Sequence, residues 1–231
     1  YGPITRTVKD AALMLDALVG PHDSDRFTLP GPDVSYFETV DETPEDLKIG
    51  LTTDLGFVRA INPEVKEEVT KSARLLEKMD WDVEEVKIKI KKPEFAFNTI
   101  ITAGFAHDIK PLITEDVELD TTLVRMTKAG MTYSAQDIKG AEAQREDFYA
   151  SVANLFKTHD VLITPSTAVP AFGLGKMFTT KIKGKRASPT AWMSFTYPFN
   201  MTGHPAASIP CGWTKDGLPI GMQVVGKRLK D

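Results

Sequence analysis

The residues that could carry out chemistry are few and widely spaced along the chain. The four histidines, His22, His107, His159 and His204, include no pair at i and i+4, and a zinc site needs three or four convergent ligands. The single cysteine, Cys211, follows an apolar run and is interpreted as a buried, unreactive thiol. The sequence holds no GxSxG, HExxH, GxxxxGK[ST] or paired CxxC motif. Spacing alone therefore predicts no catalytic residues and no metal site.

Composition excludes several classes of protein. The 231 residues are 42% hydrophobic and carry a net charge of -4. This charge predicts no basic surface that would bind nucleic acid or an anionic membrane. The basic tract at Lys181, Lys183, Lys185 and Arg186 is short, and we expect it to be a solvated loop. No apolar run approaches the ~18–20 residues of a membrane span, and no signal peptide is visible. These features predict a cytoplasmic protein.

Patterning predicts the elements of the first half. Thr7 can cap a helix whose apolar stripe runs from Val8 to Val19, and residues 21–46 are predicted to be an irregular connection. Residues 47–51 form a predicted strand, Asn62-Pro63-Glu64 starts a predicted helix, and residues 82–90 alternate like a half-exposed strand. Strand, helix and strand in this order are typical of a βαβ unit.

The second half is predicted to be helical first and then strand-rich. Residues 94–159 are mostly helical, and Ser134 with Asp137 resembles a capping box for a long helix that ends near Phe156. Residues 160–164 form an apolar run typical of a buried strand. Residues 207–210 and 219–225 are two strands around a turn at Lys215-Asp216-Gly217. The pattern indicates one α/β unit without a clean linker.

Several stretches resemble the amidase-signature family. The opening GPITRTVKDAALMLDALVG is similar to the family's GP-x-x-RTV-x-DAA segment, and DVLITPSTAVPAF resembles its strand-to-proline turn. The tail PFNMTGHPAASIPCGWTKDGLPIGMQVVGKR resembles the family block PFN-x-TG-x-PA...PCG...GLP-x-G-x-Q. The matches run in family order from Gly2 to Arg228. The resemblance implies an α/β fold with one mixed β-sheet covered by helices, here an incomplete amidase domain over residues 1–231.

The resemblance also implies which residues are missing. The family hydrolyses amides with a serine nucleophile, a second serine in a cis peptide bond and a lysine base, all N-terminal to the GP-x-x-RT motif, which here begins at Gly2. No GGSSGG-like run occurs in the chain. We therefore expect the chain to be a C-terminal part of a linear-amide hydrolase, cut at Tyr1 and lacking the extreme C-terminus. By itself it is expected to be inactive, and the chemistry needs no metal or organic cofactor.

The same resemblance places a substrate-binding wall in this chain. Arg145 matches a family arginine that meets a substrate carboxylate, although a surface role on a helix of mixed charge is the alternative. Trp192, Phe199, Asn200 and Thr202 fall near the acyl pocket of the family. For Trp192 and Phe199 a plain core role is an equally good interpretation, because aromatic side chains bury large areas anywhere. Asn200 and Gly203 are interpreted as residues of backbone turns.

Two other functions stay open. The first is the A subunit of a glutamine-dependent tRNA amidotransferase, where an acidic residue holds the glutamine amino group. By spacing, that position falls near Met193, which favours a less polar amide. The second is a non-catalytic binding or assembly domain on the same scaffold. The expected partners are a small-molecule amide and, because a divided sheet exposes strand edges, another copy of the chain or the missing N-terminal segment.

Overall fold

The computed structural model describes residues 2–114 and 117–230. By its internal contacts the chain divides into two compact units, residues 1–45 and residues 46–231. Among the described residues, no helix has the length and apolar character needed to cross a membrane. That the whole chain acts as a single incomplete domain stays a prediction.

The first unit holds two helices joined by one carboxylate. Helix α1 (Val8–Leu18) begins where the Thr7 hydroxyl accepts the Asp10 amide, as predicted, but only Ala12 of its apolar stripe is buried. Helix α2 (Tyr36–Thr39) lies within residues 21–46, so the prediction of a wholly irregular connection is wrong. Asp16 of α1 accepts hydrogen bonds from the Ser35 hydroxyl at 2.6 Å and the Tyr36 amide at 2.8 Å. The Ser35 hydroxyl also accepts the Glu38 amide at 3.2 Å, so a local cap and a carboxylate from α1 together form a helix start that the turn-rich composition concealed.

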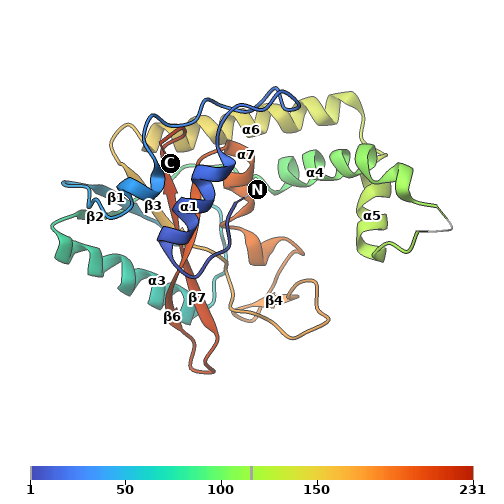
Figure 1. Ribbon diagram of the computed structural model, residues 1–231. Helices are drawn as coiled ribbons and strands as arrows, with labels where there is room; N and C mark the ends of the chain where they lie inside the picture. Colours follow the sequence, from blue (N-terminus) through green and yellow to red (C-terminus); the bar gives the residue numbers. More distant parts are fainter. Residues whose placement is uncertain (1, 115–116, 231) are drawn as a thin grey trace. The chain divides into compact units, whose positions relative to one another are not determined.

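The second unit is built on a mixed five-stranded sheet (Figure 1). Its strands lie in the order β2 (Asp82–Glu85), β1 (Lys48–Leu51), β3 (Val161–Pro165), β7 (Pro219–Gly226) and β6 (Ala206–Trp213). Strand β1 pairs in parallel with β2 and β3, whereas β7 pairs antiparallel with β3 and β6. The predicted βαβ unit and the C-terminal hairpin are both confirmed. The β2 strand ends at Glu85, so the predicted strand over residues 82–90 is too long.

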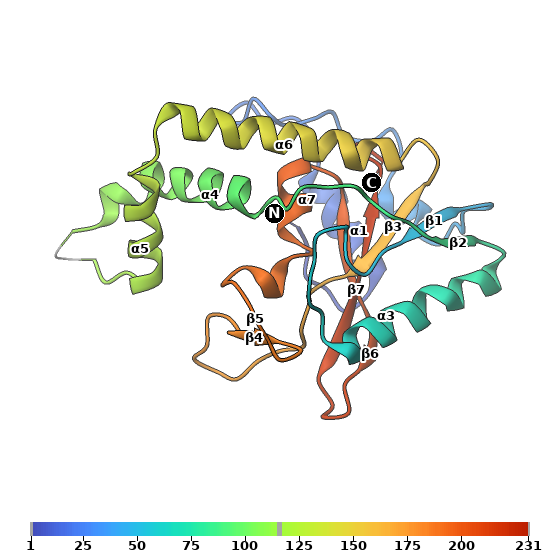
Figure 2. The same ribbon diagram turned by 180° about the vertical axis from the view of Figure 1, so that it is seen from behind.

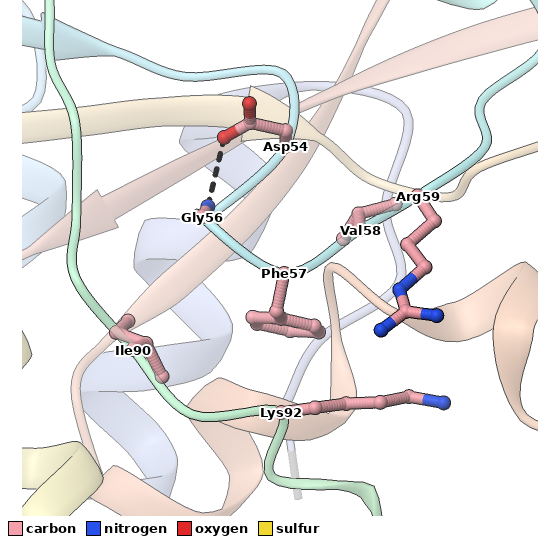
Figure 3. A pocket seen from close by; sticks show the side chains of 7 residues that line it. All are labelled: Asp54, Gly56, Phe57, Val58, Arg59, Ile90 and Lys92. Atoms are coloured by element: carbon pink, nitrogen blue, oxygen red, sulfur yellow. Dashed lines mark hydrogen bonds between the residues drawn. The ribbon is translucent and has the colours of Figure 1, made fainter.

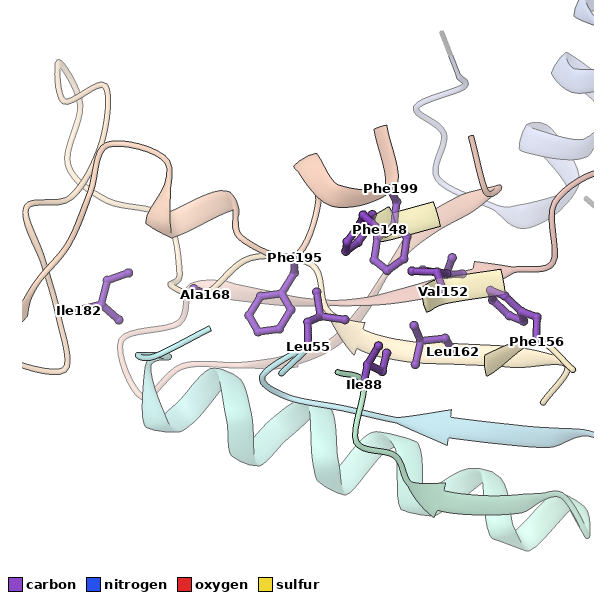
Figure 4. Close-up of a cluster of buried hydrophobic side chains, with 11 residues drawn as sticks. Leu55, Ile88, Phe148, Val152, Phe156, Leu162, Ala168, Ile182, Phe195 and Phe199 are labelled. Carbon is purple, nitrogen blue, oxygen red and sulfur yellow. The ribbon is translucent and has the colours of Figure 1, made fainter. Parts of the chain in front are cut away.

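Two hydrophobic clusters lie on opposite faces of this sheet. Helix α3 (Pro63–Leu75) covers one face, where Val65, Val69 and Ala73 pack with Ile163 of β3. The other face packs against α6 (Ala135–Leu155), and Leu162, the neighbour of Ile163, belongs to that cluster (Figure 4). Adjacent residues of a strand point to opposite faces, so the continuous apolar run of β3 serves both layers. The result is an α/β fold with helices on both sides.

The remaining elements extend from this framework (Figure 2). Helix α4 (Glu94–Asp108) packs against α6 and against α5 (Thr121–Gly130). Short 3-10 turns η1, η2 and η3 cover Leu76–Met79, Lys110–Leu112 and Ala191–Met193, and helix α7 covers Tyr197–Thr202. The basic tract forms a small hairpin, β4 (Lys181–Ile182) and β5 (Lys185–Arg186), rather than the predicted loop. Its solvated character is confirmed for the basic side chains, since only Ile182 is buried.

Candidate functional site

The candidate site centres on residues 188–204, a segment that lies beyond the carboxyl ends of two parallel strands. The Trp192 carbonyl accepts a hydrogen bond from the Ala168 amide at 2.8 Å, and the Ala168 carbonyl accepts one from the Asn62 amide at 2.8 Å. Ala168 follows β3 and Asn62 precedes α3, the helix that follows β1. Ligands of α/β proteins usually bind outside the carboxyl ends of parallel strands. The main chain therefore brings this segment to the edge where a site is expected.

Trp192 lies on η3 and is half-buried. Its ring meets Phe172 edge to face, with ring centroids 5.7 Å apart and an interplanar angle of 80°. This edge-to-face geometry is favourable for an aromatic pair. Because Trp192 is only half-buried, part of its indole ring is exposed and presents apolar surface to a ligand.

Phe199 occupies a different environment, in the core beneath α6. Its side chain is 3% exposed and belongs to the cluster that contains Phe148, Val152 and Phe156 (Figure 4). The structure favours the core interpretation for this residue. A role in contacting substrate stays a prediction.

Thr202 and His204 form a buried polar pair at the end of α7. The Thr202 hydroxyl lies 2.8 Å from Nδ1 of His204 and donates to the Phe199 carbonyl at 3.3 Å. The His204 ring stacks on Phe156 at 5.2 Å and lies at a tilt to Tyr149 at 5.5 Å. Burial, and then the positive charge of Arg228, lowers the pKa of His204. Both effects favour the neutral imidazole. Because the Thr202 hydroxyl donates its proton to the Phe199 carbonyl, its oxygen is left to accept from His204, which favours the tautomer with the proton on Nδ1.

Asn200 is exposed on α7 in ordinary helical conformation. The prediction that it serves a backbone turn is wrong. The same prediction is confirmed for Gly203, whose φ of +66° ends α7 in the left-handed region. The side-chain amide of Asn200 therefore lies at the surface of the segment and forms no turn.

Gln223 anchors the middle of the segment to the sheet. This residue of β7 is 4% exposed, and its Nε2 donates to the Thr164 hydroxyl and to the Phe195 carbonyl, both at 2.8 Å. Buried amides that find two partners hold their surroundings in one arrangement. Gln223 therefore ties the Phe195 carbonyl, between η3 and α7, to strands β3 and β7.

Glu94 anchors the start of the segment to α4. Its carboxylate accepts hydrogen bonds from the hydroxyls of Ser188, at 2.5 Å, and of Thr190, and it pairs with Lys92. Burial acts to raise the pKa of Glu94, but the bonds from Lys92, Ser188 and Thr190 outweigh it, so the pKa is lowered. The carboxylate is therefore ionised and serves as an anchor rather than as a proton donor.

Arg145 lies apart from the other predicted residues. It is half-exposed on α6, and its guanidinium Nη2 is 3.8 Å from the carboxylate of the neighbouring Glu146. In the described part of the chain, no hydrogen bond or ion pair joins it to Trp192, Phe199, Asn200 or Thr202. Binding of a substrate carboxylate by Arg145 stays a prediction.

Three residues that position the site were not predicted as site residues from the sequence, although Gln223 is the last residue of the family block GLP-x-G-x-Q. Glu94, His204 and Gln223 act through partners 94, 2 and 28 residues away, respectively, and only the histidine contact is local. Gln223 did carry a signal, because it is a lone amide within the apolar run of its strand. Pairing in three dimensions was needed to show which carbonyl it holds.

Comparison with known proteins gives a consistent result. The family model described as Amidase matches residues 1–231. An acylamidase of Rhodococcus erythropolis is 30% identical over all of this chain and 49% of its own length. The A subunit of a glutamyl-tRNA(Gln) amidotransferase from Sulfurihydrogenibium is also 30% identical, over 98% of this chain and 50% of its own. The chain thus spans about half the length of the curated relatives it matches.

Solved structures show the same relationship. A bacterial aryl acylamidase of the amidase signature enzymes is 28% identical, with a TM-score of 0.89 over 98% of this chain and 49% of that one. A 6-aminohexanoate cyclic dimer hydrolase, 24% identical, has a TM-score of 0.85 over 98% of this chain and 50% of that one, and shares the fold.

Proposed function

Because the chain belongs to the amidase-signature family, we propose that the whole protein hydrolyses the C–N bond of a linear carboxylic amide. In this proposal the chain supplies the substrate-side wall of the active site. The proposal is supported by the family match over residues 1–231 and by relatives that include an acylamidase and an aryl acylamidase. The observation that carries it is the segment 188–204, held beyond the strand ends by Glu94, Gln223 and the Thr202–His204 pair.

The proposed reaction is acyl transfer to serine, followed by hydrolysis of the acyl-enzyme by water. Serine nucleophile, cis serine and lysine base are proposed to lie outside these 231 residues, in the part of the relatives' length that the chain does not span. Backbone amides would stabilise the oxyanion. The contribution of this chain is orientation of the acyl group, by Trp192 and the exposed face of η3 and α7. Prearranged walls of this kind lower the entropy cost of reaching the transition state.

We propose a substrate less polar than glutamine. By spacing, the acidic residue that holds the amino group of glutamine in the family's amidotransferase subunit falls near Met193, which is half-buried on η3. Trp192 and Phe172 beside it offer aromatic surface. The amidotransferase A subunit of Sulfurihydrogenibium is nevertheless similar over nearly the whole chain, so glutamine hydrolysis is the second candidate function.

A direct test measures the mass and the activity of the protein. Intact-mass analysis and sequencing of the reading frame around Tyr1 would show whether a lysine and a Ser-rich run precede it. The 231-residue chain and the full reading frame are then assayed with 4-nitroacetanilide, a chromogenic anilide, and with L-glutamine. We expect hydrolysis of the anilide by the longer protein only, with glutamine the poorer substrate.

Each other outcome has a definite meaning. Hydrolysis by the 231-residue chain alone would show that the nucleophile lies within it and that the division proposed here is wrong. Faster hydrolysis of glutamine than of the anilide would favour the amidotransferase function over the amidase function. Lack of hydrolysis by any longer form would leave the binding or assembly domain as the better account.

A further inference from the structure

A hollow with an apolar floor and a cationic side lies outside the segment 188–204. It has a volume of about 320 Å³ and is formed by the turn that follows β1 and the extended stretch that follows β2 (Figure 3). Its lining residues are Asp54, Gly56, Phe57, Val58, Arg59, Ile90 and Lys92. None of the five predicted site residues lines it.

The turn that forms one side of this hollow is rigidly built. The Asp54 carbonyl accepts the amides of Phe57 at 3.0 Å and Val58 at 2.7 Å, and its carboxylate accepts the Gly56 amide at 2.8 Å. Gly56 has a φ of +73°, and a Cβ there would lie 1.9 Å from the Ile88 carbonyl oxygen. The turn therefore packs directly against the main chain opposite, which only glycine permits. The hollow exists before any ligand binds.

The cationic side consists of Arg59 and Lys92. In Figure 3 both side chains extend to the same side of the hollow, and the Phe57 ring lies beside them. The Lys92 ammonium pairs with Glu94, whereas Arg59 is exposed and has no ion pair or hydrogen bond of its guanidinium within residues 2–114 and 117–230. The Asp54 carboxylate points away from both tips and is already bonded to Gly56. A planar guanidinium without a carboxylate partner suits a carboxylate from a ligand.

The floor determines what kind of carboxylate fits. Phe57, Val58 and Ile90 are partly buried and pack against the hydrophobic cluster beneath α6. A small inorganic anion would leave this apolar surface wet, whereas an aryl or alkyl group would cover it. We propose that this hollow binds a small apolar carboxylate, with its acid group on Arg59 and Lys92 and its apolar body on Phe57. Binding is independent of the proposed hydrolysis, because it requires neither the nucleophile nor turnover.

The test is a titration of the uniformly ¹⁵N-labelled chain with benzoate, followed by NMR. We expect saturable shifts of the amide signals of Gly56, Phe57, Arg59 and Ile90, with weaker binding at higher salt. Acetophenone, which lacks the charge, and inorganic phosphate, which lacks the apolar body, are titrated in parallel. Both should bind at least about tenfold more weakly than benzoate, the factor that about 1.4 kcal/mol represents.

Variants identify the binding group. Arg59→Met should weaken benzoate binding about tenfold, as loss of a charge-assisted hydrogen bond does, whereas Arg125→Met on the exposed face of α5 should leave it unchanged. Lys92→Met provides a second variant should Arg59→Met fail to fold, and it should also weaken binding. The proposal is overturned if benzoate shifts do not saturate, if acetophenone or phosphate binds as tightly, or if the folded variants at positions 59 and 92 retain full affinity.

Discussion

His204 lies where its neutral form is favoured and its charged form is not. The ring is 6% exposed, packs between Phe156 and Tyr149, and faces the positive charge of Arg228. Both burial and that charge disfavour protonation, so the pKa in the folded chain is lower than in the unfolded chain. The unfolded state consequently binds a proton at a pH where the folded state does not. Folding stability is thereby linked to pH through one side chain.

We expect the free energy of unfolding to fall as the pH is lowered below about 6.5, the ordinary pKa of histidine. The loss continues until the pH reaches the lowered pKa of His204, because only below it do both states carry the proton. His204→Phe keeps a ring between Phe156 and Tyr149 but does not titrate, so its stability should depend less on pH in this window. Urea unfolding at several pH values between 7 and 5 measures the slope.

His107 provides the matched control for this experiment. Its side chain is 92% exposed near the end of α4. His107→Gln should leave the pH dependence as in the parent chain. Equal slopes for the parent and His204→Phe would contradict the assignment of the pH dependence to His204.

At the scale of elements, helices α4 and α5 approach each other closely at one glycine. A Cβ on Gly130 would lie 1.8 Å from the Thr102 carbonyl oxygen and 2.4 Å from its carbon. Because both are backbone atoms, no side chain can move aside to relieve the contact. Gly140 of α6 is different, since its added Cβ would meet nothing within 4 Å.

We therefore expect alanine to have opposite effects at these two positions. Gly130→Ala should lower the free energy of unfolding by about 1–3 kcal/mol or more, as overpacking does. Gly140→Ala should raise it by about 0.5–1 kcal/mol, because alanine favours the helix interior relative to glycine. Urea denaturation of the two variants beside the parent measures both. A tolerated alanine at position 130 would mean that α4 and α5 do not pack as the structure has them.

At the scale of the whole molecule, the outer edge of β6 is open. This strand, Ala206–Trp213, pairs with β7 on one side, and no strand of the described residues pairs with its other side. Residues 206–210 are exposed, and Ile209 is 36% exposed. An exposed, apolar edge strand of this length is a template for pairing with another chain. The acylamidase relative is about twice as long as this chain. In a protein of that length, a segment outside these 231 residues is an alternative partner for this edge.

We expect the 231-residue chain to self-associate through this edge. Ile209→Lys should shift sedimentation-velocity profiles toward monomer, because a charged side chain on an edge strand opposes pairing. Leu174→Lys, at a fully exposed loop position, is the matched control and should change nothing. A parent chain that sediments as a monomer at all concentrations would contradict the prediction of an open, associating edge.

The sequence by itself determined the elements whose signals are local. The caps at Thr7, Asn62 and Ser134 are confirmed because each bonds an amide two or three residues further on. The apolar run of β3, the hairpin around Gly217 and the strand-helix-strand order predicted an α/β unit, and the family resemblance implied that its sheet is mixed. Family motifs in order along the chain gave the family.

Only the tertiary structure decided how the candidate site is held together. Phe199 belongs to the core and Trp192 to the edge of the site, although both are aromatic residues in the same short segment. The bonds of Gln223 to Phe195 and of Glu94 to Ser188 join residues 28 and 94 positions apart, and the hollow beside Arg59 needs two segments that are separated by helix α3. Periodicity and capping are set by near neighbours in the chain, whereas burial and polar pairing depend on which elements the fold brings into contact.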